Sequence, residues 1–223
     1  MAAWPQERLA ATPAHIHQRN VDLSERRLII CQPAAPALVL GSVQPEDDFD
    51  ADILRARGLP VVRRRSGGGA VLVRPGRILW TEVILPAGDP LWDEDVGRSF
   101  LWLGRVWAAA LRACGIERAG VYEGPLLHTR WSRRICFAGL GPGEVTVSGR
   151  KVVGISQRRR REGAQFHVAT VLDWDPDDLV GLVRTTEGER SDLSGQLGEL
   201  ATAVPVPEDQ LVLALTRALA QLD

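Results

Sequence analysis

The amino-acid sequence predicts a layered α+β domain. Short segments rich in branched and aromatic residues follow one another in runs, separated by glycine and proline, and only a few long helical patterns interrupt them. This order is typical of α+β folds, whereas regular alternation of strands and helices indicates a parallel βαβ sheet. A chain of 223 residues, 45% of them hydrophobic, is long enough to bury the core of one domain without disulfides or metals.

The N-terminal half predicts an arm followed by mostly strands. Residues 1–25 are polar, contain proline and have weak periodicity, so we expect a loosely docked N-terminal arm. A short helix closed by Gly58 is expected at 48–58. The expected strands are bounded by glycine or proline and lie at 26–32, 37–44, 59–64, 69–75 and 77–86.

The C-terminal half predicts helices at its ends and strands between them. Residues 93–114 carry acids in the first turn and apolar residues at helical spacing, with Gly115 after them. Asp175 and Pro176 are typical of a helix N-terminus, and 207–222 places four leucines on one helix face. Strand-like segments broken by glycine lie between these helices, at 130–139, 143–149, 150–157 and 164–174.

Composition excludes several classes of function. The net charge of −1 gives no basic field for nucleic acid or an anionic membrane, and no apolar run approaches the roughly 20 residues that span a bilayer. Three cysteines without CxxC spacing indicate reduced thiols, and the N-terminus lacks a signal-peptide pattern, so we expect a cytoplasmic protein. The histidines and cysteines are scattered, so we expect no metal site.

The stretch "RRRSGGGAVLV" at 63–73 is the first candidate site. Three glycines allow left-handed backbone and bring amide groups close to a ligand, and successive amides can form a nest for an anion. Neither GxxxxGK[ST] nor GxGxxG followed by a helix is present, so this is not a common nucleotide loop. From spacing alone, a tight connection between strands with solvated arginines remains an equal alternative.

The second candidate site is centred on Lys151, the only lysine among 27 basic residues. A sequence that otherwise uses arginine for positive charge indicates that a compact ammonium is needed at this position. Residues 130–161 contain nine basic residues and one acid, Glu144, a local balance of +8 in a nearly neutral chain. Such focusing suits a phosphate-bearing molecule or an acidic partner, although the "RRRR" run at 158–161 also fits a solvated hairpin tip.

Together these motifs resemble the lipoate–protein ligase A family. "RRRSGGGAV" is similar to its arginine and triple-glycine motif, "GRKVVGISQ" to its lysine strand, and "QFHVATVL" to its histidine-containing strand. "LVLGSVQ" resembles its "GRxQ" segment, with Ser42 in place of the arginine. The resemblance covers residues 26–185, but "LVRPGRILW" lacks the His, Asp and Asn of the family's "YHDxGN" stretch.

The resemblance implies a fold and a reaction. The fold would be that of class II aminoacyl-tRNA synthetases and biotin–lipoate ligases, a mixed sheet flanked by helices, with a catalytic domain at 26–185 and a short helical extension at 186–223. Family ligases use ATP and Mg²⁺ to form lipoyl-AMP from lipoate. They then pass the lipoyl group to a lysine of a lipoyl carrier domain, in 2-oxoacid dehydrogenases or the glycine cleavage H protein. We therefore expect a lipoate–protein ligase.

The resemblance also implies roles for individual residues. Lys151 would contact the carboxylate and phosphate and is the expected catalytic residue, because cations stabilise charge that builds up during activation. The glycine segment would line the acyl tunnel. The expected substrate-binding residues belong to the three motifs: Arg64, Ser66, Gly67, Gly68, Gly69, Ala70, Gly154, Ser156, Gln157 and His167.

Two alternatives remain open. "ICFAG" resembles the "ACF"-like segment of related octanoyltransferases and amidotransferases, in which a cysteine carries the acyl group as a thioester. Cys136 would then be catalytic without ATP, octanoate would be the acyl group and an acyl carrier protein a partner; the surrounding arginines favour a thiolate. The chain could instead be a non-catalytic homologue that binds lipoate or an adenylate. The remaining cysteines and three tryptophans are expected in the core: Cys31, Cys114, Trp102, Trp107 and Trp131.

Overall fold

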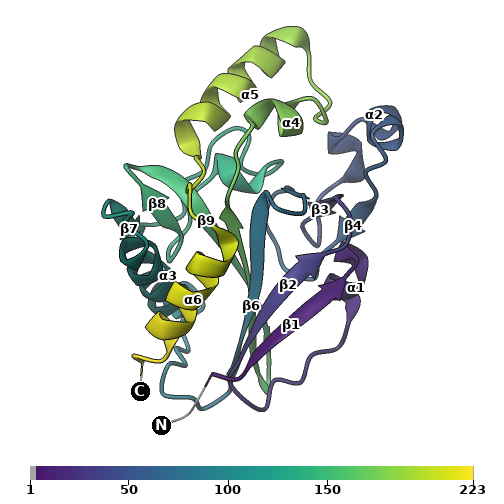
Figure 1. Ribbon diagram of the computed structural model, residues 1–223. Coiled ribbons are helices and arrows are strands. Elements are labelled where there is room, and N and C mark those ends of the chain that lie inside the picture. Colours follow the sequence, from purple (N-terminus) through teal and green to yellow (C-terminus); the bar gives the residue numbers. More distant parts are fainter. Residues whose placement is uncertain (1–3, 223) are drawn as a thin grey trace.

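A large mixed sheet forms the centre of the molecule (Figure 1). The computed structural model describes residues 4–222. In this part of the chain the larger sheet has the order β1-β2-β6-β10-β9-β8-β7, with β1 parallel to β2 and the other neighbours antiparallel. Its strands are β1 Gln6–Ala11, β2 Arg27–Pro33, β6 Ile78–Pro86, β7 Ala119–Val121, β8 Val145–Val147, β9 Arg150–Arg160 and β10 Gly163–Val171.

A smaller sheet and two helices cover the two faces of the larger sheet. The smaller sheet has the order β4-β3-β5, from β4 Val61–Arg63, β3 Ala37–Leu40 and β5 Val71–Val73. Side chains of β6 alternate between the two layers, as a strand buried on both faces requires. Leu79 and Val83 pack in one core with helices α3 (Leu101–Ala113) and α6 (Glu208–Leu219), whereas Trp80 and Ile84 pack in another with the smaller sheet.

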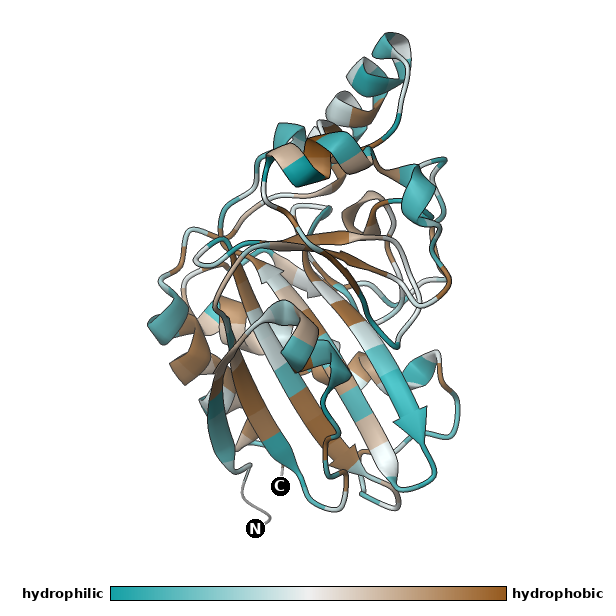
Figure 2. Ribbon diagram, turned by 90° about the vertical axis from the view of Figure 1, so that its right-hand side faces the viewer, coloured by the Kyte–Doolittle hydropathy of each residue, from teal (hydrophilic) through white to brown (hydrophobic). Residues whose placement is uncertain are grey.

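A helical lobe with a third core lies at one end of the sheets (Figures 1 and 2). It contains α2 (Ala51–Ala56), α4 (Pro176–Val180) and α5 (Glu187–Leu200). The surface of α5 is largely hydrophilic in Figure 2, but Leu193 and Leu197 are fully buried against Trp131 and Ile135. The remaining helix, α1 (Pro13–Gln18), packs beside β1 and β4.

Most expected elements are confirmed. The mixed sheet flanked by helices is present, and β2, β6, β9 and β10 lie where branched and aromatic runs predicted strands. Gly58 has φ +61 after α2, and the Asp175 side chain accepts from the Asp177 backbone at the start of α4. Two helices follow residue 186, and the Leu211, Leu215 and Leu219 side chains of α6 are buried as its spacing predicted.

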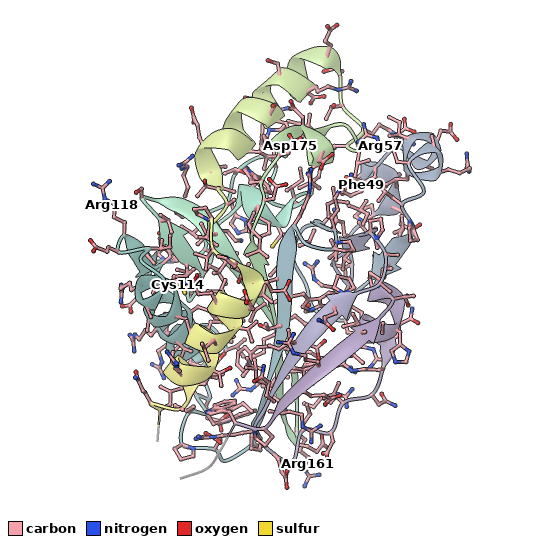
Figure 3. The ribbon with its side chains drawn as sticks, viewed as in Figure 1. Phe49, Arg57, Cys114, Arg118, Arg161 and Asp175 are labelled. Atoms are coloured by element: carbon pink, nitrogen blue, oxygen red, sulfur yellow. The ribbon has the colours of Figure 1, made fainter. Side chains whose placement is uncertain are left out.

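The tryptophans and cysteines were expected in the core. Trp107 and Trp131 are nearly inaccessible, Trp102 is half-buried against the core, and Cys31 is buried. Cys114 is half-buried at the end of α3, where Figure 3 labels it. Three of these five side chains are therefore fully enclosed and two lie at the margin of the core.

The N-terminal arm was wrongly expected to be loosely docked. Residues 1–3 lie outside the described residues, but β1 pairs with β2 from Gln6 opposite Leu28 to Ala11 opposite Pro33. It is an edge strand, and its side chains are mostly exposed. Backbone pairing of an edge strand needs no apolar side chains, so the sequence lacked a hydrophobic pattern.

Two further elements differ from expectation. The helix expected from residue 93 begins only at Leu101, because Asp93 and Asp95 accept backbone hydrogen bonds from Asp95 and Arg98 and hold turns instead. The segment 130–139, expected as a strand, consists of turns and the 3₁₀ helix Cys136–Ala138. Its apolar side chains still reach the cores, which explains why its composition was typical of a strand.

Candidate active site

Cys136 and Lys151 lie together at the centre of the molecule. Cys136 begins the 3₁₀ helix, and Lys151 is the second residue of β9. The Lys151 Nζ atom lies 3.8 Å from the Cys136 Sγ atom and donates to the carbonyl oxygens of Cys136 (3.0 Å) and Gly139 (3.1 Å). The lysine side chain is therefore anchored on the loop that carries the cysteine.

Glu144 completes the environment of Lys151. Its Oε2 atom lies 2.7 Å from Nζ and accepts from the Gly141 amide at 2.8 Å, while Oε1 accepts from the Ile155 amide at 3.3 Å. Both partners are almost fully buried. Burial alone lowers the pKa of Lys151, but its interactions with Cys136 and Glu144 outweigh this and raise the pKa above the ordinary value. Lys151 is therefore held as an ammonium beside the thiol.

Arg64 supports the glycine segment from within. Its guanidinium donates to the carbonyl oxygens of Gly67 (2.7 Å) and Gly69 (2.9 Å), and burial lowers its pKa. These contacts point the carbonyl groups inward. Among the described residues, the Gly67 and Gly68 amides have no hydrogen-bond partner, and both glycines line a cleft. The segment therefore presents free donors to that cleft.

The glycine segment touches the cysteine loop so closely that a side chain cannot fit between them. A Cβ atom on Gly69 would lie 2.7 Å from the Ile135 backbone and 2.8 Å from the Cys136 nitrogen. The Cys136 amide donates to the Ala70 carbonyl at 3.0 Å. Ser66 donates to the Ser156 hydroxyl of β9 at 3.0 Å. The two sequence motifs thus meet at the cysteine.

Two cavities join at Cys136. The outer cleft has a volume of about 760 Å³, in the range of ligand sites, and is lined by the glycine segment, Lys151 and Glu144. The inner cavity lies between the two sheets and is mainly apolar, with Val39, Val71 and Val73 from the smaller sheet. Both cavities share four lining residues: Arg64, Cys136, Ile155 and Ser156.

A buried polar network forms one wall of the inner cavity. The His167 Nδ1 atom lies 3.2 Å from Glu82 Oε1, and Arg19 donates to both oxygens of Glu82. Burial alone raises the pKa of Glu82, but His167 and Arg19 lower it to about 2. The ring of His17 from α1 lies 5.0 Å from that of His167, centroid to centroid. Burial, with further contributions from His167 and Arg64, lowers the pKa of His17 to about 2.

The structure brings together most, but not all, of the expected site residues. Gly154 lies against the Lys151 side chain, and His167 lines the inner cavity. Gln157 lines neither cavity and accepts from the Ser99 hydroxyl at 3.4 Å. The four-arginine run lies far from this cluster, with Arg161 at the tip of the β9–β10 hairpin (Figure 3).

Sequence reasoning assigned no role to Glu144, His17 or Gln44. The Gln44 side chain donates to the Arg134 carbonyl at 2.9 Å and accepts from the Gly41 amide at 3.3 Å. It thereby joins the "LVLGSVQ" segment to the loop that carries Cys136. Glu144 had one signal, because it is the only acid in the basic stretch 130–161. His17 stands outside every motif, so only the fold reveals its position.

Across residues 4–222 no group of three or more His, Cys, Asp or Glu side chains is arranged to hold a metal ion. Within the same range no helix is both long and apolar enough to cross a bilayer.

Comparisons with known proteins give a consistent picture. The model of the lipoyl protein ligase A/B catalytic domain matches residues 5–202. The octanoyltransferase LipM of Moorella thermoacetica is 32% identical over 152 residues, which cover 67% of this chain and 54% of that protein. LipM of Clostridioides difficile is 28% identical and matches 65% of this chain and 52% of its own length. The chain thus spans about half the length of these curated relatives.

Solved structures share the fold. The bipartite lipoate protein ligase of Thermoplasma acidophilum, studied with its E2 lipoyl domain, superposes with a TM-score of 0.77 at 18% identity and covers 99% of this chain and 84% of that one. A lipoate-protein ligase A bound with ATP gives a TM-score of 0.73 at 18% identity, over 98% and 85% of the two chains. At this identity the likeness concerns the fold, and it confirms the lipoate-ligase-like architecture that the motifs predicted.

Proposed function

The chain belongs to the lipoyl protein ligase A/B catalytic-domain family, and we propose that within it the protein is an ATP-independent acyltransferase with Cys136 as nucleophile. This is the second of the functions that the sequence suggested. The observation that carries it is the position of Cys136, at the junction of both cavities and 3.8 Å from an ammonium group. Cysteine attacks as its thiolate, and the ammonium lies where it would neutralise that negative charge. The curated relatives named as octanoyltransferases support this choice.

The first half-reaction acylates the cysteine. The Cys136 thiolate attacks the carbonyl carbon of a thioester donor, forming a new C–S bond and a tetrahedral oxyanion. The free amides of Gly67 and Gly68 are the donors available for this oxygen. Collapse breaks the donor's C–S bond and releases a thiolate, which takes a proton from solvent, while Lys151 stays an ammonium.

The second half-reaction transfers the acyl group to an amine. A lysine amine of the acceptor attacks the acyl-Cys136 carbonyl through the outer cleft, forming the amide bond and restoring the Cys136 thiolate. The attacking amine gives its proton to solvent, so the two half-reactions together consume no net acid or base. Glu144 keeps the lysine in place throughout.

We assign a medium-chain acyl group as the transferred unit, with octanoyl as the first to test. Its tail enters the inner apolar cavity, while its carbonyl stays at Cys136. That cavity measures about 50 Å³, so a bound chain pushes its walls apart. An acyl carrier protein is the proposed donor, and a lipoyl carrier domain, of a 2-oxoacid dehydrogenase or the glycine cleavage H protein, the proposed acceptor.

ATP-dependent ligation, the first function that the sequence suggested, is the second candidate. A lipoate-protein ligase A that was solved with ATP shares this fold, so ligation is tested as well. Against it stands the donor set of the cleft. Of the described residues that line the cleft, Glu144 is the sole carboxylate, and its oxygens are already bound to Lys151, Gly141 and Ile155. These residues do not fit Mg²⁺, which needs free carboxylate oxygens, so no step is assigned to ATP or Mg²⁺.

Intact mass spectrometry separates the candidates. The protein is incubated with octanoyl-acyl carrier protein alone, then with an apo lipoyl domain added, in the absence of ATP. The expected results are one octanoyl adduct that hydroxylamine removes, followed by octanoylation of the lipoyl domain. Cys136→Ser should lose both products. Because Lys151 is the only lysine in the chain, an adduct that resists hydroxylamine can be assigned to one side chain or the N-terminus.

The second arm supplies lipoate or octanoate with ATP and Mg²⁺ to the same lipoyl domain. Modification that needs ATP and survives Cys136→Ser supports the ligase and contradicts the transferase. Absence of product in both arms, with lipoate still bound, supports a non-catalytic homologue.

A further inference from the structure

One wall of the inner cavity is polar although the cavity itself suits an alkyl chain. Valine, isoleucine and alanine supply half of the lining residues, from β3, β5, β6, β9 and β10. His17 and His167 interrupt it on the same wall, beside Trp80. In an apolar slot, polar groups fix what can bind because each needs a partner.

His17 is a polar group in this wall without a partner. His17 is 7% exposed, and its Nδ1 atom is fully buried. Within residues 4–222 neither ring nitrogen makes a hydrogen bond. The ring packs at a tilt against Trp80, at 4.5 Å between centroids, and against His167. Buried polar atoms are usually satisfied, so an orphaned imidazole that lines a cavity indicates a missing ligand group.

The carboxylate of the neighbouring network is not available to His17. The Glu82 oxygens accept from Arg19 and from the Gln165 amide at 2.9 Å. The His167 Nδ1 atom lies 3.2 Å from Oε1 of the same carboxylate, but it too is buried without a hydrogen bond. The network therefore leaves His17 facing the cavity without a partner.

The charge of this wall defines the class of ligand group. With a pKa of about 2, His17 is neutral at working pH and offers one N–H donor and one nitrogen lone pair. Glu82 and Arg19 neutralise each other, and the cation in the lining, Arg64, lies at the junction with the outer cleft, so a charged group beside His17 would be costly to bury. A methyl group would leave both imidazole nitrogens unused. An uncharged hydroxyl-like group fits, since it can donate and accept.

We propose that His17 makes the inner cavity select acyl chains whose far end carries an uncharged hydrogen-bonding group over chains of equal length that end in a methyl group. The inference rests on the proposed function, because it takes the inner cavity as the binding site of the acyl tail. His17 acts as a specificity-determining residue: it contacts the far end of the chain, remote from the bond that is formed and broken.

The test compares two donors that differ by one oxygen atom, the octanoyl and 8-hydroxyoctanoyl thioesters of pantetheine. The second-order rate of Cys136 acylation is measured by intact mass. For the unaltered protein we expect the hydroxylated chain to react about tenfold faster, the ratio that one net hydrogen bond of about 1.4 kcal/mol gives. His17→Phe keeps a ring between Trp80 and His167 but removes both nitrogens, and should abolish or reverse this ratio.

Two further variants make the comparison specific. His17→Gln keeps a donor and an acceptor and should restore part of the preference for the hydroxylated chain. His15→Phe adds the same ring to an exposed position of the same helix and should leave the ratio unchanged. Melting temperatures of all variants establish that a changed ratio comes from a folded protein.

Equal rates for the two donors with the unaltered protein, or an unchanged ratio in His17→Phe, would overturn the inference while leaving the acyltransferase intact. If no donor acylates Cys136, the proposed function fails and calorimetric binding of free octanoate and 8-hydroxyoctanoate decides the inference. Tighter binding of the hydroxylated acid, lost in His17→Phe, supports it. Equal binding of the two acids, or no binding of either, overturns it.

Discussion

At the scale of single residues, Lys151 shows why an ammonium differs from a guanidinium. Its three N–H bonds meet the Cys136 carbonyl, the Gly139 carbonyl and the Glu144 carboxylate, three acceptors spread around one atom. A Cβ atom added to Gly154 would lie 3.3 Å from the Lys151 Cε atom, so the lysine stem has little spare room. A planar guanidinium is larger and directs its donors in one plane.

We therefore predict that Lys151→Arg lowers the rate of Cys136 acylation by at least about 100-fold, the usual cost of losing one positioned donor at a charged transition state. Stopped incubations with octanoyl donor and mass detection measure this rate. Arg150→Lys, the reverse exchange at the exposed neighbouring position, serves as control and should retain the normal rate. Near-normal acylation in Lys151→Arg would contradict a specific need for the ammonium.

His17 supplies the second prediction at this scale, since it links folding to pH. Its pKa falls from 6.5 to about 2 on folding, so between these values the unfolded chain binds a proton that the folded chain excludes. Stability therefore falls as pH drops below 6.5, by up to about 1.4 kcal/mol per pH unit. Glu82, lowered to about 2, adds stability that is present above its unfolded pKa of 4.5 and is lost below it.

The window between pH 6.5 and 5 thus isolates His17 from Glu82. We expect His17→Phe to show a flatter dependence of unfolding free energy on pH in this window than the unaltered protein, by roughly 1.4 kcal/mol at pH 5.5. Urea titrations at pH 7.5, 6.5, 5.5 and 5.0 measure the slopes, with His15→Phe as control. Parallel curves for the unaltered protein and His17→Phe would show that folding does not lower the pKa of His17.

At the scale of elements, the glycine segment matters because it packs against another loop. The contact of Gly69 with Ile135 and Cys136 is possible only because glycine has no side chain. A Cβ atom on Gly67, in contrast, would meet nothing within 4 Å. We predict that Gly69→Ala destabilises the protein by about 1–3 kcal/mol, the usual cost of overpacking. At roughly 2–4 °C per kcal/mol the melting temperature falls by several degrees.

Gly67→Ala is the matched control for this prediction, since neither residue has a positive φ. Its melting temperature should stay within about one degree of the unaltered protein, in line with a change of at most about 0.5 kcal/mol at an open site. Equal melting temperatures for both alanine variants would mean that the two loops separate readily.

The elements also show which parts of the fold local sequence can predict. β6 and β10 are buried on both faces and have continuous apolar runs, so their pattern reflects their position. Helix α5 was expected only as part of the helical extension at 186–223, and its own pattern is weak because it contains three glycines and few apolar residues. Its remaining signal was the capping box of Thr186 and Glu189, which the structure forms.

The site could be predicted in the same uneven way. Lys151 and the glycine triplet stand out in the sequence, one as the only lysine and the other as a rare run. Gln157 was placed in the site by its neighbours in the motif, but strand alternation turns it toward Ser99. His17 and Glu144 reach the cavities through tertiary packing, which no local pattern encodes.

At the scale of the whole molecule, the helical lobe holds the candidate site together from outside. Helix α5 packs on the segment before Cys136, where Asp192 accepts from the Trp131 indole at 3.0 Å and Glu189 from Arg130 at 2.8 Å. The chain after α5 then pairs with β9, as the Thr202 amide donates to the Lys151 carbonyl at 3.0 Å. One helix thus braces both Cys136 and Lys151.

This arrangement predicts that a cavity in the lobe loosens the cysteine loop. Leu197 is fully buried in α5, and Leu197→Ala should cost about 2–5 kcal/mol and raise amide hydrogen exchange across residues 131–139. Alkylation of Cys136 by iodoacetamide, mapped by peptide mass, should accelerate because the loop opens more often.

Leu213→Ala is the control: it removes the same atoms from a half-exposed position of α6 and should change stability by at most about 0.5 kcal/mol. If Leu197→Ala lowers stability without changing exchange or alkylation in the cysteine loop, then α5 does not brace the site, and Cys136 is held by the glycine segment and Lys151 alone.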